Sequence, residues 1–328
     1  MRHILIGGNG FLGQELARQL LDDKSATITI VDLQEGLAAG LEDHRNRLNF
    51  VHADISQAGS LDKIILGVDD VVYHLASKLI IPNVPRFKRY EYFAECSVTG
   101  TKHILRWMQA SQCSSLVFWS SDMVYGPTVH SPRREDHPRH PFGPYGRAKM
   151  EAENLIFEAE RLGYLHCTMF RPRLIIGPGR LGIMEMLFKL LDSGLPVPLI
   201  GRGNNCFQFV SVGDCASAAI LAQKGGCRSG VYNLGSSNPP SVYELMTEFV
   251  KRSGSRSVVV RTPGTLVKTL LKIMNIFKIS PMDPEQYQIA DLEVTLDTTA
   301  VMHDLGWKST DDDTAMLLAA YETYVSGK

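Results

Sequence analysis

The amino-acid sequence predicts an α/β protein with a doubly wound parallel sheet and a smaller, mixed α/β C-terminal domain. Two observations support this fold class. Short apolar runs alternate with amphipathic stretches through the first half of the chain, and a glycine-rich turn directly follows the first run. Strands buried on both faces of a parallel sheet consist of such unbroken apolar runs. A length of 328 residues fits roughly two domains of about 150 residues each.

The strands predicted in the first half are rich in β-branched and aromatic residues: Ile4–Ile6, Ile28–Val31, Phe50–Val51, Val71–Leu75 and Leu116–Trp119. Amphipathic stretches between them, such as Leu12–Leu21 and Thr101–Gln112, predict helices. Strands and helices that alternate at these lengths form the units of a doubly wound sheet.

Glycine and proline become frequent after Arg171, yet Phe209–Val212 and Val231–Leu234 again have the pattern of strands. The chain is therefore expected to pass between the two domains more than once. We expect residues 1–175, with about 205–235, to form the first domain, and about 176–204 with 236–328 to form the second.

Charge and cysteine usage limit the partners and the compartment. The 34 lysines and arginines balance 35 aspartates and glutamates, so the composition gives no electrostatic basis for nucleic-acid binding. The six cysteines form no C-x-x-C pair, which is typical of buried thiols in a reducing compartment. The N-terminus enters a strand at once, without the apolar segment of a signal peptide. We expect a cytoplasmic protein.

The apolar stretch Thr265–Ile279 needs a separate interpretation. It is shorter than the roughly 20 apolar residues that span a bilayer, so we expect no transmembrane segment. Lys268 and Lys272 share one face of the predicted helix, and apolar side chains line another. Three interpretations stay open: a helix packed on the second domain, a lid over an apolar substrate, or a helix lying on a membrane surface.

The glycine-rich turn has glycines at positions 7, 10 and 13, between a predicted strand and a predicted helix. Glycine permits positive φ, a close backbone approach to a pyrophosphate, and contact between helix and strand. The first amides of the helix then face the phosphates. Asp32 ends the second strand, where a carboxylate binds the adenosine ribose and repels a 2′-phosphate, so NAD is favoured over NADP. We expect Asp54–Ile55, at the end of the third strand, either to lie against the adenine of the cofactor or to form the N-cap of the following helix.

A phenol and an ammonium, Tyr145 and Lys149, lie four residues apart and share one face of a predicted helix. A tyrosine pKa of about 10 must fall by roughly three units, on the order of 4 kcal/mol, before the phenol acts as a base near pH 7. A partly desolvated lysine and a nicotinamide cation are able to supply this. Ser121 directly follows a predicted strand, which places its hydroxyl at the cofactor crevice.

Jointly, these motifs resemble an extended short-chain dehydrogenase/reductase of the NAD-dependent epimerase/dehydratase family. The resemblance runs nearly end to end, through Gly7–Gly13, Asp32, Asp54–Ile55, His74–Ala76, Ser120–Gly126, Pro144–Lys149, Arg171–Pro172, Gly177–Pro178, Tyr232–Gly235 and Leu305–Trp307. It implies a Rossmann fold and bound NAD. It also implies that Tyr145 is the general base, that Lys149 holds the nicotinamide ribose and that Ser121 polarises the substrate oxygen. Family members usually dimerise, through helices that correspond here to 101–112 and 145–162.

The resemblance implies a full set of site residues. The implied cofactor contacts are Gly7, Gly10, Phe11, Leu12, Gly13, Asp32, Asp54, Ile55, Leu75, Ala76, Tyr145 and Lys149. The implied substrate contacts are Ser77, Asp122, Met123 and Arg180. We expect no metal site, because the three histidines of one proline-rich loop lack a helix or hairpin to hold them: His130, His137 and His140.

Departures from the family pattern bear on the substrate. Met123 stands where family dehydratases carry glutamate, and methionine transfers no proton, so dehydration is disfavoured. Asp122 either relays a proton or caps a turn. Phe207 stands where nucleotide-sugar enzymes commonly have an arginine for the diphosphate. The candidates to replace this arginine are Arg173, Arg180 and Arg202. The alternative is that they are solvated surface residues.

We therefore expect an NAD-dependent enzyme acting on a secondary alcohol or ketone, namely a nucleotide-sugar 4-epimerase or 4-ketoreductase. The alternative is a 3β-hydroxysteroid dehydrogenase-like enzyme or β-keto-lipid reductase with an apolar alcohol or ketone as substrate. The stretches 200–205 and 265–279 favour this alternative. A non-catalytic NAD-sensing protein fits least, because such relatives lose the tyrosine or the lysine.

Overall fold

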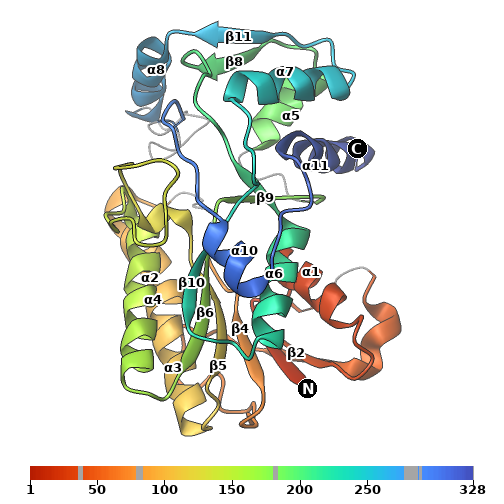
Figure 1. Ribbon diagram of the computed structural model, residues 1–328, viewed down its shortest axis with the longest axis vertical. Coiled ribbons are helices and arrows are strands. Elements are labelled where there is room, and N and C mark those ends of the chain that lie inside the picture. Colours follow the sequence, from red (N-terminus) through yellow and green to blue (C-terminus); the bar gives the residue numbers. More distant parts are fainter. Residues whose placement is uncertain (36–39, 79–83, 180–183, 277–286, 288–289, 328) are drawn as a thin grey trace.

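The computed structural model describes residues 1–327 except 36–39, 79–83, 180–183, 277–286 and 288–289. A seven-stranded sheet, with all neighbours parallel, has the order β10-β6-β5-β4-β1-β2-β3 (Figure 1). The strands are β1 (Arg2–Ile6), β2 (Thr27–Asp32), β3 (Leu48–His52), β4 (Val71–His74), β5 (Ser115–Trp119), β6 (His166–Pro172) and β10 (Gly230–Leu234). The strand order reverses between β1 and β4, so the expected doubly wound sheet is confirmed.

Successive residues of the inner strands belong to cores on opposite faces of the sheet. Leu5 and Tyr73 pack on one face, whereas their neighbours Ile4 and Val72 pack on the other. This is why these strands are unbroken apolar runs. The first core includes side chains of α1 (Phe11–Leu20), α6 (Val212–Lys224) and α10 (Thr299–Leu305), and the second includes side chains of α3 (Thr101–Ala110) and α4 (Pro144–Arg161). The helix α2 (Arg89–Ala94) continues through a π-helical turn into α3.

A third core lies above the sheet in Figure 1, where α5 (Glu185–Asp192), α7 (Val242–Arg252) and α11 (Asp313–Ser326) gather. Phe188 and Phe249, both fully buried, form ring contacts with Tyr321 there. The parallel pair β8 (Val197–Ile200) and β11 (Val259–Thr262) and the helix α8 (Gly264–Ile276) complete this part. A second parallel pair, β7 (Leu174–Ile176) with β9 (Phe209–Ser211), lies between the third core and the sheet.

The chain returns to the sheet late in the sequence. Val301 and Trp307 are buried in the first core, and the Trp307 indole N–H donates to the carbonyl of Asp214 on α6 at 2.9 Å. Both residues fall in the range that the sequence analysis assigns to the second domain. Repeated crossing is therefore a feature of this chain.

The helix α8 covers most of the apolar stretch 265–279, whose last residues lie outside the described part. A single α8 residue, Leu271, is buried, so α8 does not pack as a core helix. In the part of the chain that the structure describes, no helix combines the length and the apolar character needed to cross a bilayer.

Candidate active site

A cavity of about 630 Å³ opens at the carboxyl ends of the central strands, where the strand order reverses. All twelve residues predicted to contact the cofactor line this cavity. Of the predicted substrate residues, Ser77, Asp122 and Met123 also line it, whereas Arg180 lies outside the described residues. The fold thus gathers side chains that the sequence spreads from position 6 to position 290.

The glycine-rich turn passes directly against the end of β4. Gly7 has a φ of 83°, and a Cβ added there would lie 2.7 Å from the backbone of Ala76. A Cβ at Gly13 would lie 2.6 Å from the carbonyl oxygens of Gly7 and Gly8, where α1 packs on the turn. These contacts exclude any side chain, so no Cβ at Gly7 or Gly13 obstructs the approach of a ligand to the first amides of α1.

The acidic residues of the cavity are held in place by local hydrogen bonds. The two carboxylate oxygens of Asp32 accept hydrogen bonds from the backbone N–H groups of Asn9 and Gln34, at 2.9 and 3.1 Å. The Asp54 carboxylate accepts hydrogen bonds from the backbone N–H and the hydroxyl of Ser56, at 2.9 and 2.7 Å. Asp54 therefore lines the cavity and also caps the following turn.

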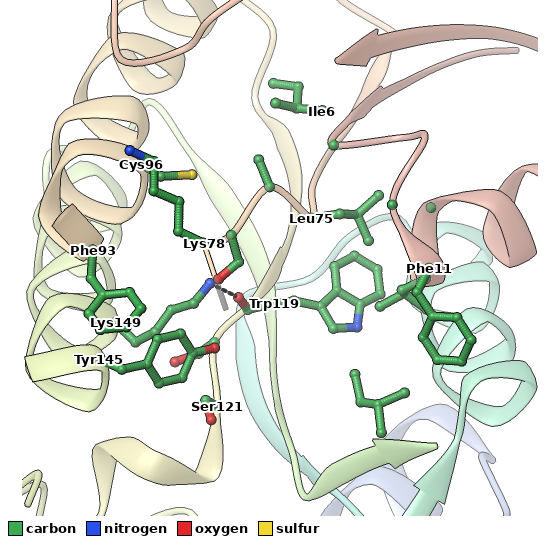
Figure 2. Close-up of a pocket in the computed structure, with 18 of the residues that line it drawn as sticks. Ile6, Phe11, Leu75, Lys78, Phe93, Cys96, Trp119, Ser121, Tyr145 and Lys149 are labelled. Atoms are coloured by element: carbon green, nitrogen blue, oxygen red, sulfur yellow. Dashed lines mark hydrogen bonds between the residues drawn. The ribbon is translucent and has the colours of Figure 1, made fainter. Parts of the chain in front are cut away.

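Tyr145 and Lys149 face the cavity from the first turns of α4, near Ser121 (Figure 2). Lys149 is only 2% exposed, and its Nζ donates to the Trp119 carbonyl at 2.9 Å. Burial lowers the pKa of Lys149 to about 8, against smaller opposing effects of Cys96 and Glu153. The Tyr145 ring meets Phe93 of α2 edge-on, with centroids 5.3 Å apart. The phenol is thus positioned by an aromatic contact beside a buried amine.

Ser121 begins the 3-10 turn Asp122–Val124. Its Oγ accepts a hydrogen bond from the Met123 N–H at 3.2 Å and lies 3.4 Å from Asp122 Oδ1. Ser121, rather than Asp122, is therefore the cap of this turn. The hydroxyl has a fixed direction before any substrate binds.

A buried network centred on Glu153 fixes α4 to the sheet. This fully buried carboxylate accepts two hydrogen bonds from Arg171 of β6, both 2.8 Å long. It also accepts from Ser120 at 2.5 Å and from Arg139 at 2.9 Å. Bidentate arginine pairs fix orientation as well as distance. The network therefore sets the position of α4, which carries Tyr145, relative to the end of β5, which Ser121 follows.

A buried ion pair joins Asp122 to Arg173 at 2.8 Å, with side chains only 6% and 8% exposed. The Arg173 guanidinium also lies over the ring of Phe207, 5.2 Å from its centroid. All three residues line the cavity. The alternatives of a turn-capping Asp122 and a solvated Arg173 are therefore wrong. No local sequence pattern reveals this pair, because 51 residues separate its members.

The sequence analysis missed further cavity residues, which carry no motif of their own: Lys78, Arg89, Phe93, Cys96 and Ala290. Lys78 pairs with Glu95 at 2.6 Å, and α2 supplies Arg89 and Phe93. Aromatic residues along 89–94 are a sequence signal for α2, but nothing in that pattern shows that its side chains line the cavity.

Among the residues that the structure describes, no histidine lines this cavity. His74 is 1% exposed, its Nε2 lies 3.0 Å from the Thr101 hydroxyl, and burial lowers its pKa to about 3. It is a neutral, packed residue of β4. Within the described residues, no group of three or more histidine, cysteine, aspartate or glutamate side chains is arranged to hold a metal ion.

Comparison with known proteins places the chain in a family. The family model for the NAD dependent epimerase/dehydratase family matches residues 3–235. The chain belongs to this family. It is accordingly an NAD-dependent enzyme of the extended short-chain dehydrogenase/reductase type.

Curated proteins with similar sequences align with most of this chain. A putative UDP-glucose 4-epimerase of Methanocaldococcus jannaschii is 28% identical over 268 residues, which is 78% of this chain and 84% of that protein. The UDP-glucose 4-epimerase of Mycolicibacterium smegmatis is 27% identical over 265 residues, 78% of this chain and 83% of that protein. An uncharacterized protein of Sinorhizobium fredii is 27% identical over 99% of this chain and 79% of its own length.

Solved structures share the fold of this family member. A UDP-glucose-4-epimerase from Stenotrophomonas maltophila, with bound NAD and formylated UDP-arabinopyranose, superposes with a TM-score of 0.79. It is 24% identical, and the match covers 100% of this chain and 98% of that one. A UDP-glucuronic acid 4-epimerase from Bacillus cereus in complex with NAD superposes with a TM-score of 0.77. It is 20% identical, and the match covers 99% of each chain. At these identities the likeness shows the fold.

The cavity of this family member has the features that NAD requires. The turn at Gly7 and Gly13 has no room for side chains beside the α1 amides, as a pyrophosphate requires. Asp32 at the end of β2 lines the same cavity as Lys149 and Tyr145 of α4. The residues present therefore fit the cofactor of the family.

Proposed function

We propose that this enzyme is a nucleotide-sugar 4-epimerase. One observation carries the proposal: Ser121, Tyr145 and Lys149 line the same cavity as the glycine-rich turn. Curated relatives that carry the name UDP-glucose 4-epimerase support the substrate class. Met123 supports epimerisation over dehydration, because a thioether beside Ser121 transfers no proton.

In this proposal Tyr145 accepts the proton of the sugar C4 hydroxyl, while the Ser121 hydroxyl donates a hydrogen bond to the same oxygen. The buried ammonium of Lys149 favours the phenolate form of the tyrosine and holds the nicotinamide ribose. NAD, when bound, supplies the site that takes up the C4 hydride and returns it to the opposite face of the keto sugar. Tyr145 then gives the proton back, so the reaction has no net redox change.

The substrate end of the cavity contains an arginine that supports a nucleotide-sugar substrate. Among the described residues, the cations Lys78, Arg89, Lys149 and Arg173 line the cavity beside the carboxylates of Asp32, Asp54 and Asp122. The Arg173 guanidinium lies over the ring of Phe207, the residue that stands where the family pattern has an arginine. We propose that Arg173 substitutes for that arginine at the substrate end of the cavity.

The test is an incubation of the purified enzyme with NAD and a panel of UDP-, GDP- and dTDP-sugars, beside 3β-hydroxysteroids. Interconverted sugar epimers without net NADH formation are the expected result. NADH formed only with steroids would contradict the proposal and favour the lipid dehydrogenase alternative. Turnover of no sugar and no steroid, with NAD bound, would instead favour an NAD-sensing protein.

We further propose the domain organisation and the assembly. Residues 1–175 and about 205–235 form the NAD-binding domain, and about 176–204 with 236–328 form the substrate domain, except that residues 299–307 pack with the sheet. The enzyme works in the cytoplasm as a homodimer through α3 and α4. Six free cysteines support a reducing compartment.

A further inference from the structure

A basic segment covers the end of the molecule farthest from the N-terminus (Figure 1). From Lys251 to Ile276 the sequence contains six lysines and arginines and no aspartate or glutamate: Lys251, Arg252, Arg256, Arg261, Lys268 and Lys272. The chain as a whole balances 34 cations with 35 anions. This segment, which includes the end of α7, β11 and α8, is therefore rich in cations. Three of them, Lys251, Arg252 and Lys268, form ion pairs with Glu248, Asp312 and Asp291.

The same segment exposes six large apolar side chains. Their exposed fractions are 58% for Val258, 41% for Val260, 65% for Leu266, 55% for Leu270, 48% for Ile273 and 69% for Ile276. We call these residues, with the six cations, the distal surface. Large apolar side chains gathered on one part of a surface mark contact with a partner or a membrane.

Local geometry explains why these side chains point outward. Val259, the first residue of β11, packs on the third core, so the residues on either side of it, Val258 and Val260, point away from that core. In α8, Leu266, Leu270 and Ile273 follow at spacings of four and three residues, which forms one stripe along the helix. The strand and the helix thus each present an apolar face beside cations.

We propose that the distal surface binds membranes that contain anionic lipids. A helix with an apolar stripe on one face and lysines on another has the pattern of a helix that lies in the lipid headgroup region. Contact between two copies through this surface would bring the same cation-rich segment, with Arg256, Arg261 and Lys272, against itself. The charge therefore favours an anionic partner, and the interleaved apolar side chains favour a lipid surface over a solvated polyanion. This proposal does not depend on the proposed reaction.

The distal surface is connected to the cavity. Lys268 of α8 forms an ion pair with Asp291, and the neighbouring Ala290 lines the cavity. A membrane bound at α8 would therefore lie on the substrate side of the enzyme rather than against the helices of the sheet.

The experiment is co-sedimentation of the full chain with vesicles of phosphatidylcholine alone or mixed with phosphatidylglycerol. We expect binding to the mixed vesicles that weakens with added salt. Leu270→Ser combined with Ile273→Ser should weaken it by about tenfold or more, and Lys272→Glu by about fivefold or more. A matched control, Ile65→Ser with Val68→Ser, removes side chains that are 84% and 58% exposed elsewhere and should leave binding unchanged.

Thermal unfolding followed by circular dichroism verifies that every variant is folded. Three outcomes would overturn the proposal: no sedimentation with the mixed vesicles, equal sedimentation with and without phosphatidylglycerol, or equal loss in the control variant. If the Leu270 and Ile273 substitutions instead reduce the mass measured by light scattering, the distal surface joins two copies of the chain and the proposal is wrong.

Discussion

Tyr145 is the residue on which the proposed chemistry depends most directly. Tyr145→Phe removes the hydroxyl that accepts the substrate proton and keeps the ring that contacts Phe93. We expect turnover to fall by about 10²-fold to 10⁴-fold, the usual contribution of a general base, with NAD affinity unchanged. Epimer formation and calorimetric titration with NAD measure the two effects. Tyr324→Phe, far from the cavity lining, is the control, and full activity in Tyr145→Phe would refute the mechanism.

Lys149 carries a charge that the fold holds at a cost. Its pKa of about 8 lies below the ordinary 10.5, so the ammonium that predominates below pH 8 is less favourable in the folded protein than in the unfolded chain. Lys149→Met should abolish turnover yet raise the free energy of unfolding at pH 7 by about 2 kcal/mol, after subtraction of the lost hydrogen bond.

The stability gained by Lys149→Met should depend on pH. Between pH 8 and 10.5 the unfolded wild-type chain keeps a proton that the folded protein has lost, so wild-type stability rises with pH through this window. The difference in the free energy of unfolding between Lys149→Met and wild type should therefore decrease from pH 7 to pH 9.5. Urea unfolding without NAD measures this difference. A variant less stable than wild type at pH 7 would contradict this explanation.

Asp32 is expected to set the choice of dinucleotide. Asp32→Ala removes the carboxylate at the end of β2 and, with it, the repulsion of a 2′-phosphate. We expect NADP to bind at least about tenfold more tightly than to wild type, while NAD binds more weakly. Parallel titrations with both dinucleotides measure the ratio. An unchanged preference would exclude the ribose role of Asp32.

Residues with local motifs were predictable, and residues paired across the fold were not. Gly7, Asp32 and Tyr145 belong to short patterns whose spacing has a physical reason. Asp122 and Arg173 meet only because β5 and β6 are neighbours in the sheet, and burial then forces the two charges to pair. The sequence leaves open whether an arginine is buried or solvated, and packing decides it.

At the scale of elements, the junction of β1 and α1 should tolerate no added atom at Gly13. Gly13→Ala places a Cβ 2.6 Å from backbone atoms of Gly7 and Gly8, so the glycine-rich turn must shift. We expect NAD affinity to fall by roughly tenfold or more while the fold persists. Gly213→Ala in α6 is the matched control, because its Cβ has no neighbour closer than 3.8 Å. Equal affinity in both variants would mean that the turn does not bind phosphates.

The central strands were predictable because each is an unbroken apolar run between turn signals. β6 was not predicted, since His166 and Arg171 interrupt its pattern and Arg171 is buried only through its pair with Glu153. β8 and β11 contain proline, arginine and half-exposed valines, so their pairing depends on the third core rather than on local pattern. For α8, periodicity predicted the helix but left its surroundings open.

At the scale of the whole molecule, the proposed homodimer is open to a direct test. Light scattering of the purified protein should give twice the mass of the chain. Asn154→Arg adds a charge to the exposed face of α4 and should shift the mass toward that of one chain. Ser193→Arg, an exposed residue after α5, is the control. A wild-type mass of one chain, or dissociation in the control alone, would contradict an interface at α3 and α4.

The late position of α11 has a consequence for synthesis. Its side chains, including Leu317 and Tyr321, cover Phe188 of α5 and Phe249 of α7. On the ribosome these aromatic rings stay uncovered until α11 has left the exit tunnel, although the strands of the sheet emerged long before. A nascent chain stalled before Asp313 would therefore expose an aromatic, aggregation-prone surface. We expect a chaperone or a protease to bind such a chain first.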